Sequence, residues 1–366
     1  MNNHISSLYI HIPFCESICD YCDFTKLQYF RIFAVPYLKQ LKKELEETVV
    51  DKDIKTIYVG GGTPTSLEDD LFLQLLKIIE PYSLNVKEYT FECNPESLSI
   101  EKIKMMKRFG VNRVSIGVES TNEKILRSIN RHHSFSDVIE ASENLRDNGI
   151  TNINFDLILG LPNVSEKMLE QDIKNILSLN PDHISCYSLT VNEHTVFYIN
   201  KIDPPSEEFA YEAYKMISEI LNKNGYVHYE VSNWAKLGKE SAHNFTYWKN
   251  EQYYGIGLGA SGYIGNIRYK NTTNLDKYLE GINNKEVEIV GQNDLEEYQI
   301  MLNLRTNLGL LLTQFNKLFN KDLYKEKKEI VDSYIKDGYL ILDKDRLLAT
   351  FEGMMILDKI ILDLIA

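Results

Sequence analysis

The sequence has few cysteines, no strongly basic segment and no long apolar run. It holds 5 cysteines in 366 residues, and three of them are clustered near the start, so a disulfide framework is excluded. The net charge is −13 and no basic stretch occurs, which argues against a nucleic-acid partner. The apolar segment 354–366 is interrupted by Asp358, Lys359 and Asp363. We therefore expect no transmembrane segment, which needs about 18 consecutive apolar residues.

The first seven residues lack a basic region followed by an apolar run, so we expect no signal peptide. These absences together predict a cytoplasmic protein. Apolar residues make up 43% of the chain, a share typical of globular proteins. The sequence leaves open whether the chain forms a homodimer and whether it associates transiently with a membrane.

Short apolar segments alternate with helical segments over the first half of the chain. We expect strands at 8–14, 55–60, 88–93, 112–118, 152–159 and 183–190. We expect helices at 36–50, 67–80, 99–109, 122–129 with 135–148, and 166–179. Ser66, Ser99 and Ser165 are the expected N-caps, and Gly110 and Gly149 the expected helix ends. This alternation predicts an α/β fold, a partial (β/α)6 barrel of parallel strands.

The pattern changes after Thr190. We expect a helix at 206–223, a strand at 226–231, a glycine-rich segment at 255–262 and a mainly helical tail from about 290. The predicted domains are residues 1–200, 201–285 and 286–366, with the C-terminal one mainly helical.

Polar residues follow the predicted strands at the same end. The glycines Gly60–Gly62 come after the second strand, Glu92 ends the third and Glu119 ends the fourth, while Asp156 lies in the fifth. Since parallel α/β folds build their sites at the carboxyl ends of strands, we expect these residues to share one site.

Cys15, Cys19 and Cys22 are separated by three and then two residues. A structural zinc site normally takes four ligands, and no fourth Cys or His lies nearby. A [4Fe–4S] cluster is usually held by four thiolates, so three would leave one iron open to an exogenous molecule. Reductive cleavage of S-adenosylmethionine (SAM) uses such an iron. The alternatives are a zinc knuckle completed from afar and reactive surface thiols. Cys93 and Cys186 are expected to be buried small hydrophobes.

Several motifs accompany the cysteines in a fixed order: Leu8-Tyr-Ile-His-Ile-Pro-Phe14, Gly60-Gly-Gly-Thr-Pro-Thr65, Glu92-Cys-Asn-Pro95, Gly110-Val-Asn-Arg-Val-Ser-Ile-Gly-Val118, Asp156-Leu-Ile-Leu-Gly-Leu-Pro162 and His243-Asn-Phe-Thr-Tyr-Trp248. With them the chain resembles the radical SAM superfamily. Within this superfamily, the chain resembles the oxygen-independent coproporphyrinogen III oxidase group, which belongs to porphyrin metabolism. Of the branches of that group, it resembles the HemW-like heme chaperones. The resemblance implies a radical SAM core at 1–200, an extension carrying HNxxYW at 201–285, and the family's C-terminal helical domain.

The resemblance also implies the site residues. Cys15, Cys19 and Cys22 would hold the [4Fe–4S] cluster. The residues implied for SAM are Tyr9, Tyr21, Gly61, Gly62, Thr63, Glu92, Glu119, Arg131 and Asp156. Carboxylates suit ribose hydroxyls, and an arginine suits a carboxylate through paired N–H donors. Glu119 stands where the family usually has Gln. For each charged residue the alternative is a surface ion pair or a helix cap, and for the tyrosines it is core packing.

The HNxxYW motif implies heme binding, and His243 is the residue expected to ligate heme iron. A neutral imidazole is a common axial ligand, and aromatic neighbours pack on a porphyrin face. The alternative is that His243 is a hydrogen-bonded structural histidine.

Two functions follow from the resemblance. The first is a heme chaperone that binds heme and delivers it to acceptor proteins, with the cluster and SAM as further cofactors. The second is the oxygen-independent coproporphyrinogen III oxidase, an enzyme that uses a 5′-deoxyadenosyl radical. Phe24 replaces an additional cysteine of the oxidases, and the cysteine motif begins at residue 15 without the oxidases' N-terminal extension. Both features favour the chaperone, and whether the chain is an enzyme at all stays open.

Overall fold

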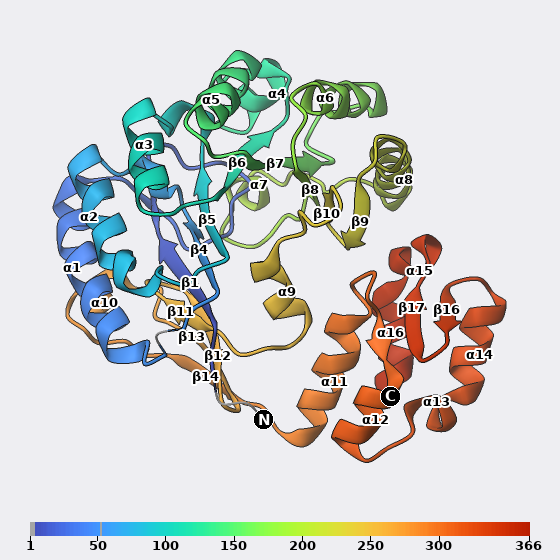
Figure 1. Ribbon diagram of the computed structural model, residues 1–366. Coiled ribbons are helices and arrows are strands. Elements are labelled where there is room, and N and C mark those ends of the chain that lie inside the picture. The colour runs from blue at the N-terminus through green and yellow to red at the C-terminus, as the bar shows by residue number, and fades with distance from the viewer. Residues whose placement is uncertain (1–3, 52) are drawn as a thin grey trace.

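The computed structural model describes residues 4–51 and 53–366, and its centre is a nine-stranded sheet in the order β11-β1-β4-β5-β6-β7-β8-β10-β9 (Figure 1). Six strands follow one another in parallel: β1 (Ser7–Ile12), β4 (Thr56–Gly61), β5 (Glu88–Cys93), β6 (Arg113–Glu119), β7 (Asn152–Leu159) and β8 (His183–Ser188). The expected strands therefore exist, and the predicted parallel barrel is confirmed.

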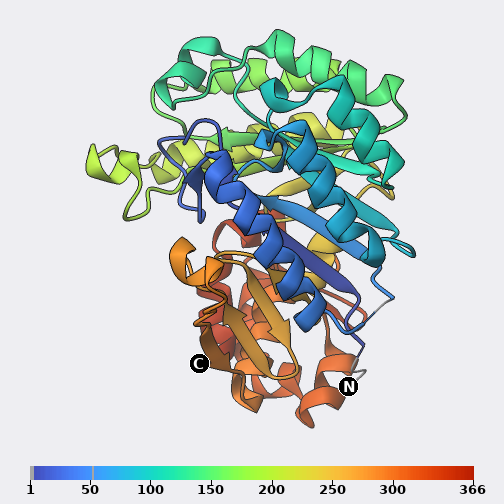
Figure 2. The same ribbon diagram turned by 90° about the vertical axis from the view of Figure 1, so that its left-hand side faces the viewer.

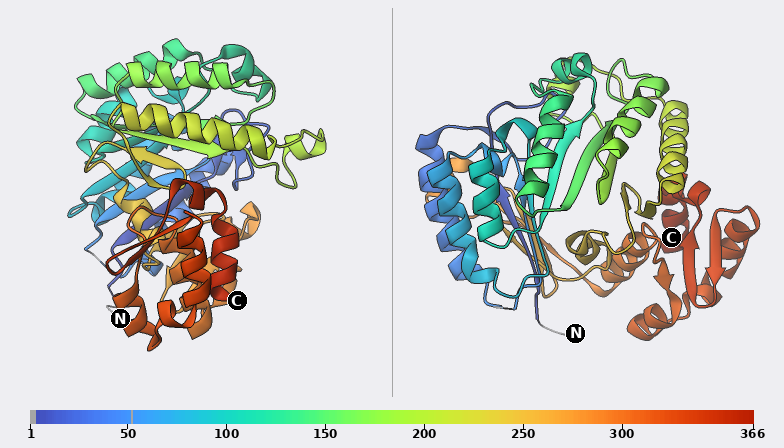
Figure 3. Two further views of the ribbon diagram at one scale, coloured as in Figure 1. Left: turned by 90° about the vertical axis from the view of Figure 1, so that its right-hand side faces the viewer. Right: turned by 45° about the horizontal axis from the view of Figure 1, so that its top comes forward.

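Helices cover the outer face of this sheet in an arc (Figure 1 and Figure 3, right). They are α1 (Arg31–Thr48), α2 (Asp69–Ile79), α3 (Ile100–Arg108), α4 (Glu123–Ser128), α5 (Phe135–Asp147), α6 (Glu166–Ser178) and α8 (Glu207–Lys223). Their apolar faces meet alternate strand residues such as Ile10, Val59 and Phe91, which are 0% exposed. Alternate residues of a strand point to opposite faces, so the other set, including Tyr58 and Glu92, lies on the inner face.

Local capping explains where the helices begin and end. Ser99 and Ser165 cap α3 and α6 as predicted, each accepting a hydrogen bond from a backbone N–H of the first turn. The N-cap expected at Ser66 is wrong, because this residue ends the 3-10 helix η1 (Pro64–Ser66) and its Oγ donates to Phe14 O. Helix α1 begins at Arg31 and includes Pro36, which the sequence pattern had placed at its start.

The sheet continues past the boundary predicted at residue 200. On one edge β10 (Asn233–Ala235) pairs antiparallel with β8 and with β9 (Val227–Glu230); on the other, β11 (Tyr254–Ile256) pairs parallel with β1. Between them α9 (Ala242–Trp248) lies on the inner side of the sheet (Figure 1). The domain boundaries at 200/201 and 285/286 stay predictions.

Smaller elements complete this part of the chain: β2 (Phe14–Cys15), β3 (Leu27–Gln28), η2 (Glu80–Tyr82), η3 (Pro95–Ser97), α7 (Val196–Ile199), α10 (Leu275–Leu279), and an antiparallel sheet of β12 (Ser261–Ile264), β13 (Ile267–Lys270) and β14 (Glu286–Ile289). Helix α7 projects from the rim that also carries the cysteine segment (Figure 2).

The C-terminal part has its own hydrophobic core, centred on residues such as Ile300, Phe315, Leu347 and Ile360. It consists of α11 (Gln292–Asn303), α12 (Leu312–Phe319), α13 (Leu323–Glu326), α14 (Lys328–Lys336), α15 (Phe351–Met355), α16 (Leu357–Ile365), β15 (Leu310–Leu311), β16 (Leu340–Asp343) and β17 (Arg346–Ala349). It is mainly helical, as expected. No helix among the described residues is long and apolar enough to cross a membrane.

Candidate functional site

A cavity with a volume of about 360 Å³ lies at the carboxyl ends of strands β4–β8. This volume is within the range of small-molecule sites. Its wall includes most of the residues predicted for the cluster and for SAM: Cys15, Cys19, Tyr21, Cys22, Gly61, Gly62, Thr63, Glu92, Glu119, Arg131 and Asp156. The structure thus brings together residues that lie far apart in the sequence, as the strand-end pattern predicted.

The three cysteines lie on the segment between β1 and α1. Cys15 is buried and the other two are half-buried. Burial raises the pKa of Cys15 to about 11 and that of Cys22 to about 12, and it also raises the pKa of Cys19. The free thiols are therefore protonated at neutral pH, and a metal centre must displace those protons when it binds. Among residues 4–51 and 53–366, no group of three or more His, Cys, Asp or Glu side chains is arranged so that it could hold a single metal ion.

The cysteine segment is held in place by the loop after α4 and by β1. Asn130 Nδ2 donates to Ile18 O at 2.8 Å, and the Asp20 N–H donates to Ile129 O at 3.2 Å. On the other flank, His11 Nε2 lies 2.7 Å from Thr25 O. Three thiols on one anchored segment, facing one cavity, fit a cluster with an open side toward that cavity.

The glycine turn at the end of β4 packs against β1. Gly61 has φ +116°, and a Cβ there would overlap the His11 ring. A Cβ at Gly62 would lie 2.7 Å from Phe14 O. The missing side chains therefore make room for the protein itself. The contact of Gly61 and Gly62 with SAM, which the resemblance implies, stays a prediction. The turn still faces the cavity through its backbone, and the Gly61 N–H donates to Glu92 Oε2 at 2.9 Å.

Four carboxylates line the cavity, those of Asp23, Glu92, Glu119 and Asp156. Burial opposes the ionisation of Glu92, Glu119 and Asp156. Burial raises the pKa of Glu92 and of Glu119 to about 7, and it raises that of Asp156 as well. Glu92 accepts hydrogen bonds from Tyr58 OH at 2.7 Å and from the glycine turn. Asp156 accepts from Ser115 Oγ at 2.8 Å. Because a nearby positive charge favours the ionised forms, this wall suits a cationic ligand.

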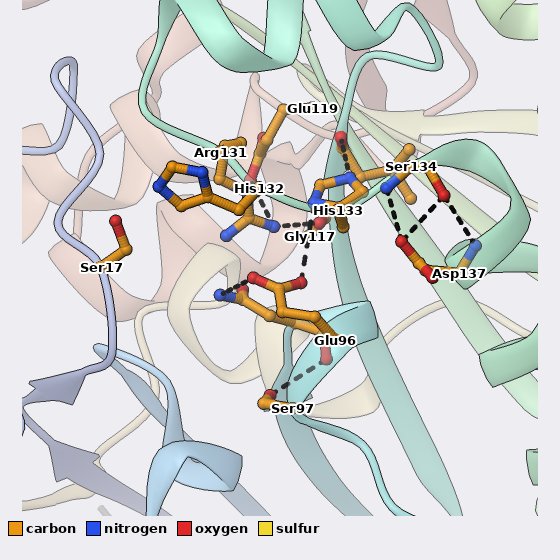
Figure 4. A network of polar contacts seen from close by, with 12 residues as sticks. Ser17, Glu96, Ser97, Gly117, Glu119, Arg131, His132, His133, Ser134 and Asp137 are labelled. Carbon is orange, nitrogen blue, oxygen red and sulfur yellow. Dashed lines mark hydrogen bonds and ion pairs between the residues drawn. The ribbon is translucent and has the colours of Figure 1, made fainter.

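Glu119 and Arg131 face each other across the end of β6 (Figure 4). Glu119 has φ 63°, in the left-handed region, at an irregularity in the pairing of β6 with β7. Its Oε1 lies 3.9 Å from Arg131 Nη2, and Arg131 also donates to Gly117 O. The Nε of this buried guanidinium has no partner among the described residues. An unpaired buried donor at the cavity wall is suited to an incoming carboxylate or other acceptor.

Two predicted residues are not brought into this cavity. Tyr9 lies beside a second cavity, and its OH is 2.9 Å from His11 Nδ1. His243 is 0% exposed, with Nδ1 2.8 Å from Thr56 Oγ1 and Nε2 2.7 Å from Tyr247 OH. An axial ligand needs a free ring nitrogen, and both nitrogens of His243 are engaged. This geometry favours the alternative interpretation of His243 as a structural histidine, and heme ligation by His243 stays a prediction.

The cavity also contains residues that the sequence reading missed, among them Tyr58, Asn94, Ser115 and Tyr187. Tyr58 is two positions before Gly60 and Ser115 is four before Glu119, so the period-2 alternation of strands could have placed them on the site face. Cys93 is buried as predicted, at 3% exposure, but it also lines the cavity. Cys186 is buried at 1% exposure.

Comparison with known proteins agrees with this arrangement. Residues 9–176 match the model of the radical SAM superfamily, and residues 291–356 match that of the HemN C-terminal domain. A protein named heme chaperone HemW from Lactococcus lactis is 38% identical to this chain, and the match covers 98% of each. The protein of the same name from Bacillus subtilis is 37% identical, covering 96% of this chain and 97% of its own.

Among solved structures, the coproporphyrinogen III oxidase HemN of Escherichia coli, described as a radical SAM enzyme, superposes with a TM-score of 0.86. The superposition covers 99% of this chain and 90% of HemN, at 22% sequence identity, so it shows a shared fold. A radical SAM family implies a [4Fe–4S] cluster and SAM, and most of the residues predicted for them line the cavity described above. The chain belongs to the HemW family of the radical SAM superfamily.

Proposed function

We propose that this protein is a heme chaperone, which binds heme and delivers it to acceptor proteins, and that its first cavity holds a [4Fe–4S] cluster together with SAM. The observation that carries the cofactor part is the convergence of the three clustered cysteines, the glycine turn, the strand-end carboxylates and Arg131 on one cavity. The heme part rests on the relatives named heme chaperone HemW, which match this chain over almost its whole length.

In this proposal Cys15, Cys19 and Cys22 bind three irons of the cluster as thiolates and leave the fourth without a protein ligand. When bound, the cluster and SAM supply electron transfer and reductive cleavage of a carbon–sulfur bond. The chain itself contributes binding and orientation. It fixes the cysteine segment through Asn130 and His11 and presents the glycine turn to the ligand.

SAM carries a sulfonium and an ammonium group, and the carboxylates of the cavity complement both. Burial raises the pKa of Glu92 to about 7 and also raises the pKa of Asp156, and a cation beside these carboxylates favours their ionised forms. Arg131, with its unpaired Nε, would bind the SAM carboxylate. Glu119 would then accept a hydrogen bond from an amino or ribose hydroxyl group of the ligand.

The oxidase is the alternative, and one residue argues against it. Phe24, which replaces the additional cysteine of the oxidases, is 65% exposed and lines the cavity that contains the cysteines. The structural likeness to HemN concerns the fold and does not bear on the reaction.

One experiment separates the two functions. The protein is reconstituted with iron and sulfide under anaerobic conditions and incubated with SAM, a reductant and coproporphyrinogen III. A parallel sample is titrated with heme and then mixed with the heme-free form of a heme protein. The proposal expects stoichiometric heme binding, transfer to the acceptor, and no decarboxylation. Protoporphyrinogen formed over many turnovers would overturn the proposal in favour of the oxidase.

A further inference from the structure

Lys26 is the one basic residue of the segment between β1 and α1 that carries the three cysteines, and it lines the first cavity. Arg131 is the other basic residue among the described residues of this wall, and it faces Glu119. Lys26 is half-buried. In the part of the chain that the structure describes, its ammonium forms no ion pair and donates to Cys22 O. Since charges that leave water are normally paired, this ammonium is available to a negative group in the cavity.

The backbone is fixed on both sides of Lys26. Before it, Thr25 O lies 2.7 Å from His11 Nε2. After it, the Leu27 N–H donates to Pro13 O at 2.6 Å, and Leu27 begins β3, which pairs in parallel with β2, the strand that ends at the first cysteine. The fold therefore places the positive charge beside the thiols, and the side chain has only to reach back to the carbonyl of the third cysteine.

The charge of Lys26 acts on two of the three thiols. Burial raises the pKa of Cys22 to about 12, and Lys26 is the first of the groups that oppose this rise. Burial also raises the pKa of Cys15 to about 11, and Lys26 opposes that rise together with Thr63 and Arg131. A group bound by these two sulfur atoms would be exposed to the same positive charge.

A positive charge at this place has a definite effect on an iron–sulfur cluster. A [4Fe–4S] cluster held by three thiolates carries a net negative charge, and its reduction adds one more electron. A nearby positive charge therefore stabilises the reduced state more than the oxidised state. Because the net charge and the surroundings of a cluster set its reduction potential, removal of the positive charge should make that potential more negative.

We propose that Lys26 is a positioning residue whose fixed ammonium stabilises the reduced cluster and so sets the potential at which the site accepts an electron. The inference rests on the proposed function, because it requires that the three cysteines hold a cluster. It goes beyond that function by assigning the control of the reduction step to one side chain. In this step a low-potential one-electron donor is oxidised and the cluster is reduced. No bond forms or breaks at Lys26, which keeps its proton.

Two variants separate the charge of Lys26 from its hydrogen bond. Lys26→Gln removes the charge and keeps an N–H donor for Cys22 O, whereas Lys26→Arg keeps both the charge and a donor. The control is Lys39→Gln, because Lys39 is an exposed residue of α1, the helix that follows the cysteine segment, and does not line the first cavity.

The measurement is the midpoint potential of the cluster. Each protein is reconstituted with iron and sulfide and titrated anaerobically with dithionite in the presence of mediator dyes and without SAM, and the reduced cluster is followed by electron paramagnetic resonance. We expect Lys26→Gln to make reduction about three- to tenfold less favourable, which for a one-electron couple is a potential about 30–60 mV more negative. Lys26→Arg and Lys39→Gln should have the wild-type potential. Visible absorption measures the cluster content of each protein.

Each outcome decides the inference. A full cluster at the wild-type potential in Lys26→Gln would overturn the role of Lys26 and leave the cofactor assignment standing. An equal shift in Lys26→Arg would also overturn it, because that variant keeps the charge. If Lys26→Gln assembles no cluster, assembly in Lys26→Arg would support the role of the charge, and failure in both variants would overturn it. Failure of the wild-type protein to hold a cluster would overturn the cofactor proposal itself.

Discussion

Replacing Glu92 by Gln should remove a large pH dependence from the stability of the cofactor-free protein. Burial raises the pKa of Glu92 from 4.5 to about 7, and the ionised form is further disfavoured by Asp156 and favoured by Tyr58, Gly61 N–H and Arg113. The folded state therefore holds the proton more tightly than the unfolded chain does. By linkage, the contribution of this group to stability is present at low pH and is lost as the pH rises toward 7.

The magnitude follows from the shift. One pKa unit corresponds to about 1.4 kcal/mol, so ionised Glu92 costs the folded state about 3 kcal/mol, of which about 2.5 kcal/mol is lost between pH 5 and pH 8. The amide introduced by Glu92→Gln cannot accept from both Tyr58 OH and the Gly61 N–H, which adds a penalty of about 1–3 kcal/mol at every pH. The diagnostic quantity is thus the change with pH of the difference in free energy of unfolding between variant and wild type.

Urea unfolding at pH 5, 6, 7 and 8 measures this difference, with the fluorescence of Trp234, which is 0% exposed, as one probe and circular dichroism as another. Relative to wild type, Glu92→Gln should become more stable by about 2.5 kcal/mol between pH 5 and pH 8. Glu140→Gln, at an exposed position of α5, is the matched control and should show no such trend. A difference in free energy of unfolding that stays constant from pH 5 to pH 8 would refute the account of Glu92 as a buried carboxyl group whose ionisation is disfavoured in the folded state.

Three further predictions concern named side chains. Cys19→Ser should abolish assembly of the cluster, whereas Cys93→Ser should retain its visible absorption; loss of the cluster in a folded Cys93→Ser would show that the ligands are misassigned. Gly61→Val should lower stability as well as SAM affinity, because φ +116° and the His11 ring leave no room for a Cβ, and an unchanged urea midpoint would contradict this. His243→Ala should destabilise the protein by about 1–3 kcal/mol, because Thr56 and Tyr247 lose a hydrogen-bond partner. Because both ring nitrogens are engaged, we expect the electron paramagnetic resonance signature of bound ferric heme to be unchanged; an altered signature would show that His243 ligates the iron.

The sequence was sufficient to predict the parallel barrel because the patterns that indicate its strands and helices are local in the sequence. Each parallel strand is a short apolar run, and caps such as Ser99 act within one turn of their helix. The start of α1 was misplaced because Pro36, which usually marks the first turn of a helix, lies within this one. The joining of β11 to β1 could not be predicted, since this pairing links residues near 9 and 255 and no local pattern specifies it.

The same difference between local and long-range signals explains which parts of the candidate site could be predicted from the sequence. That the three cysteines and the strand-end carboxylates lie around one cavity could be predicted, because the cysteines are close together in the sequence and each carboxylate lies in or at the end of a predicted strand. The environment of His243 depends on Thr56, which is 187 positions away, and no motif reports whether a ring nitrogen is free. Tyr9, which the resemblance implies for SAM, lines the second cavity, and its contact with SAM stays a prediction.

The most direct test of the central claim, that the first cavity holds a cluster whose open iron faces SAM, is electron paramagnetic resonance of the reduced, reconstituted protein with and without SAM. The account predicts a signal from one reduced [4Fe–4S] cluster that changes when SAM is added, and hyperfine coupling to isotopically labelled amino and carboxylate groups of SAM. A cluster signal that SAM leaves unchanged, with no such coupling, would contradict it.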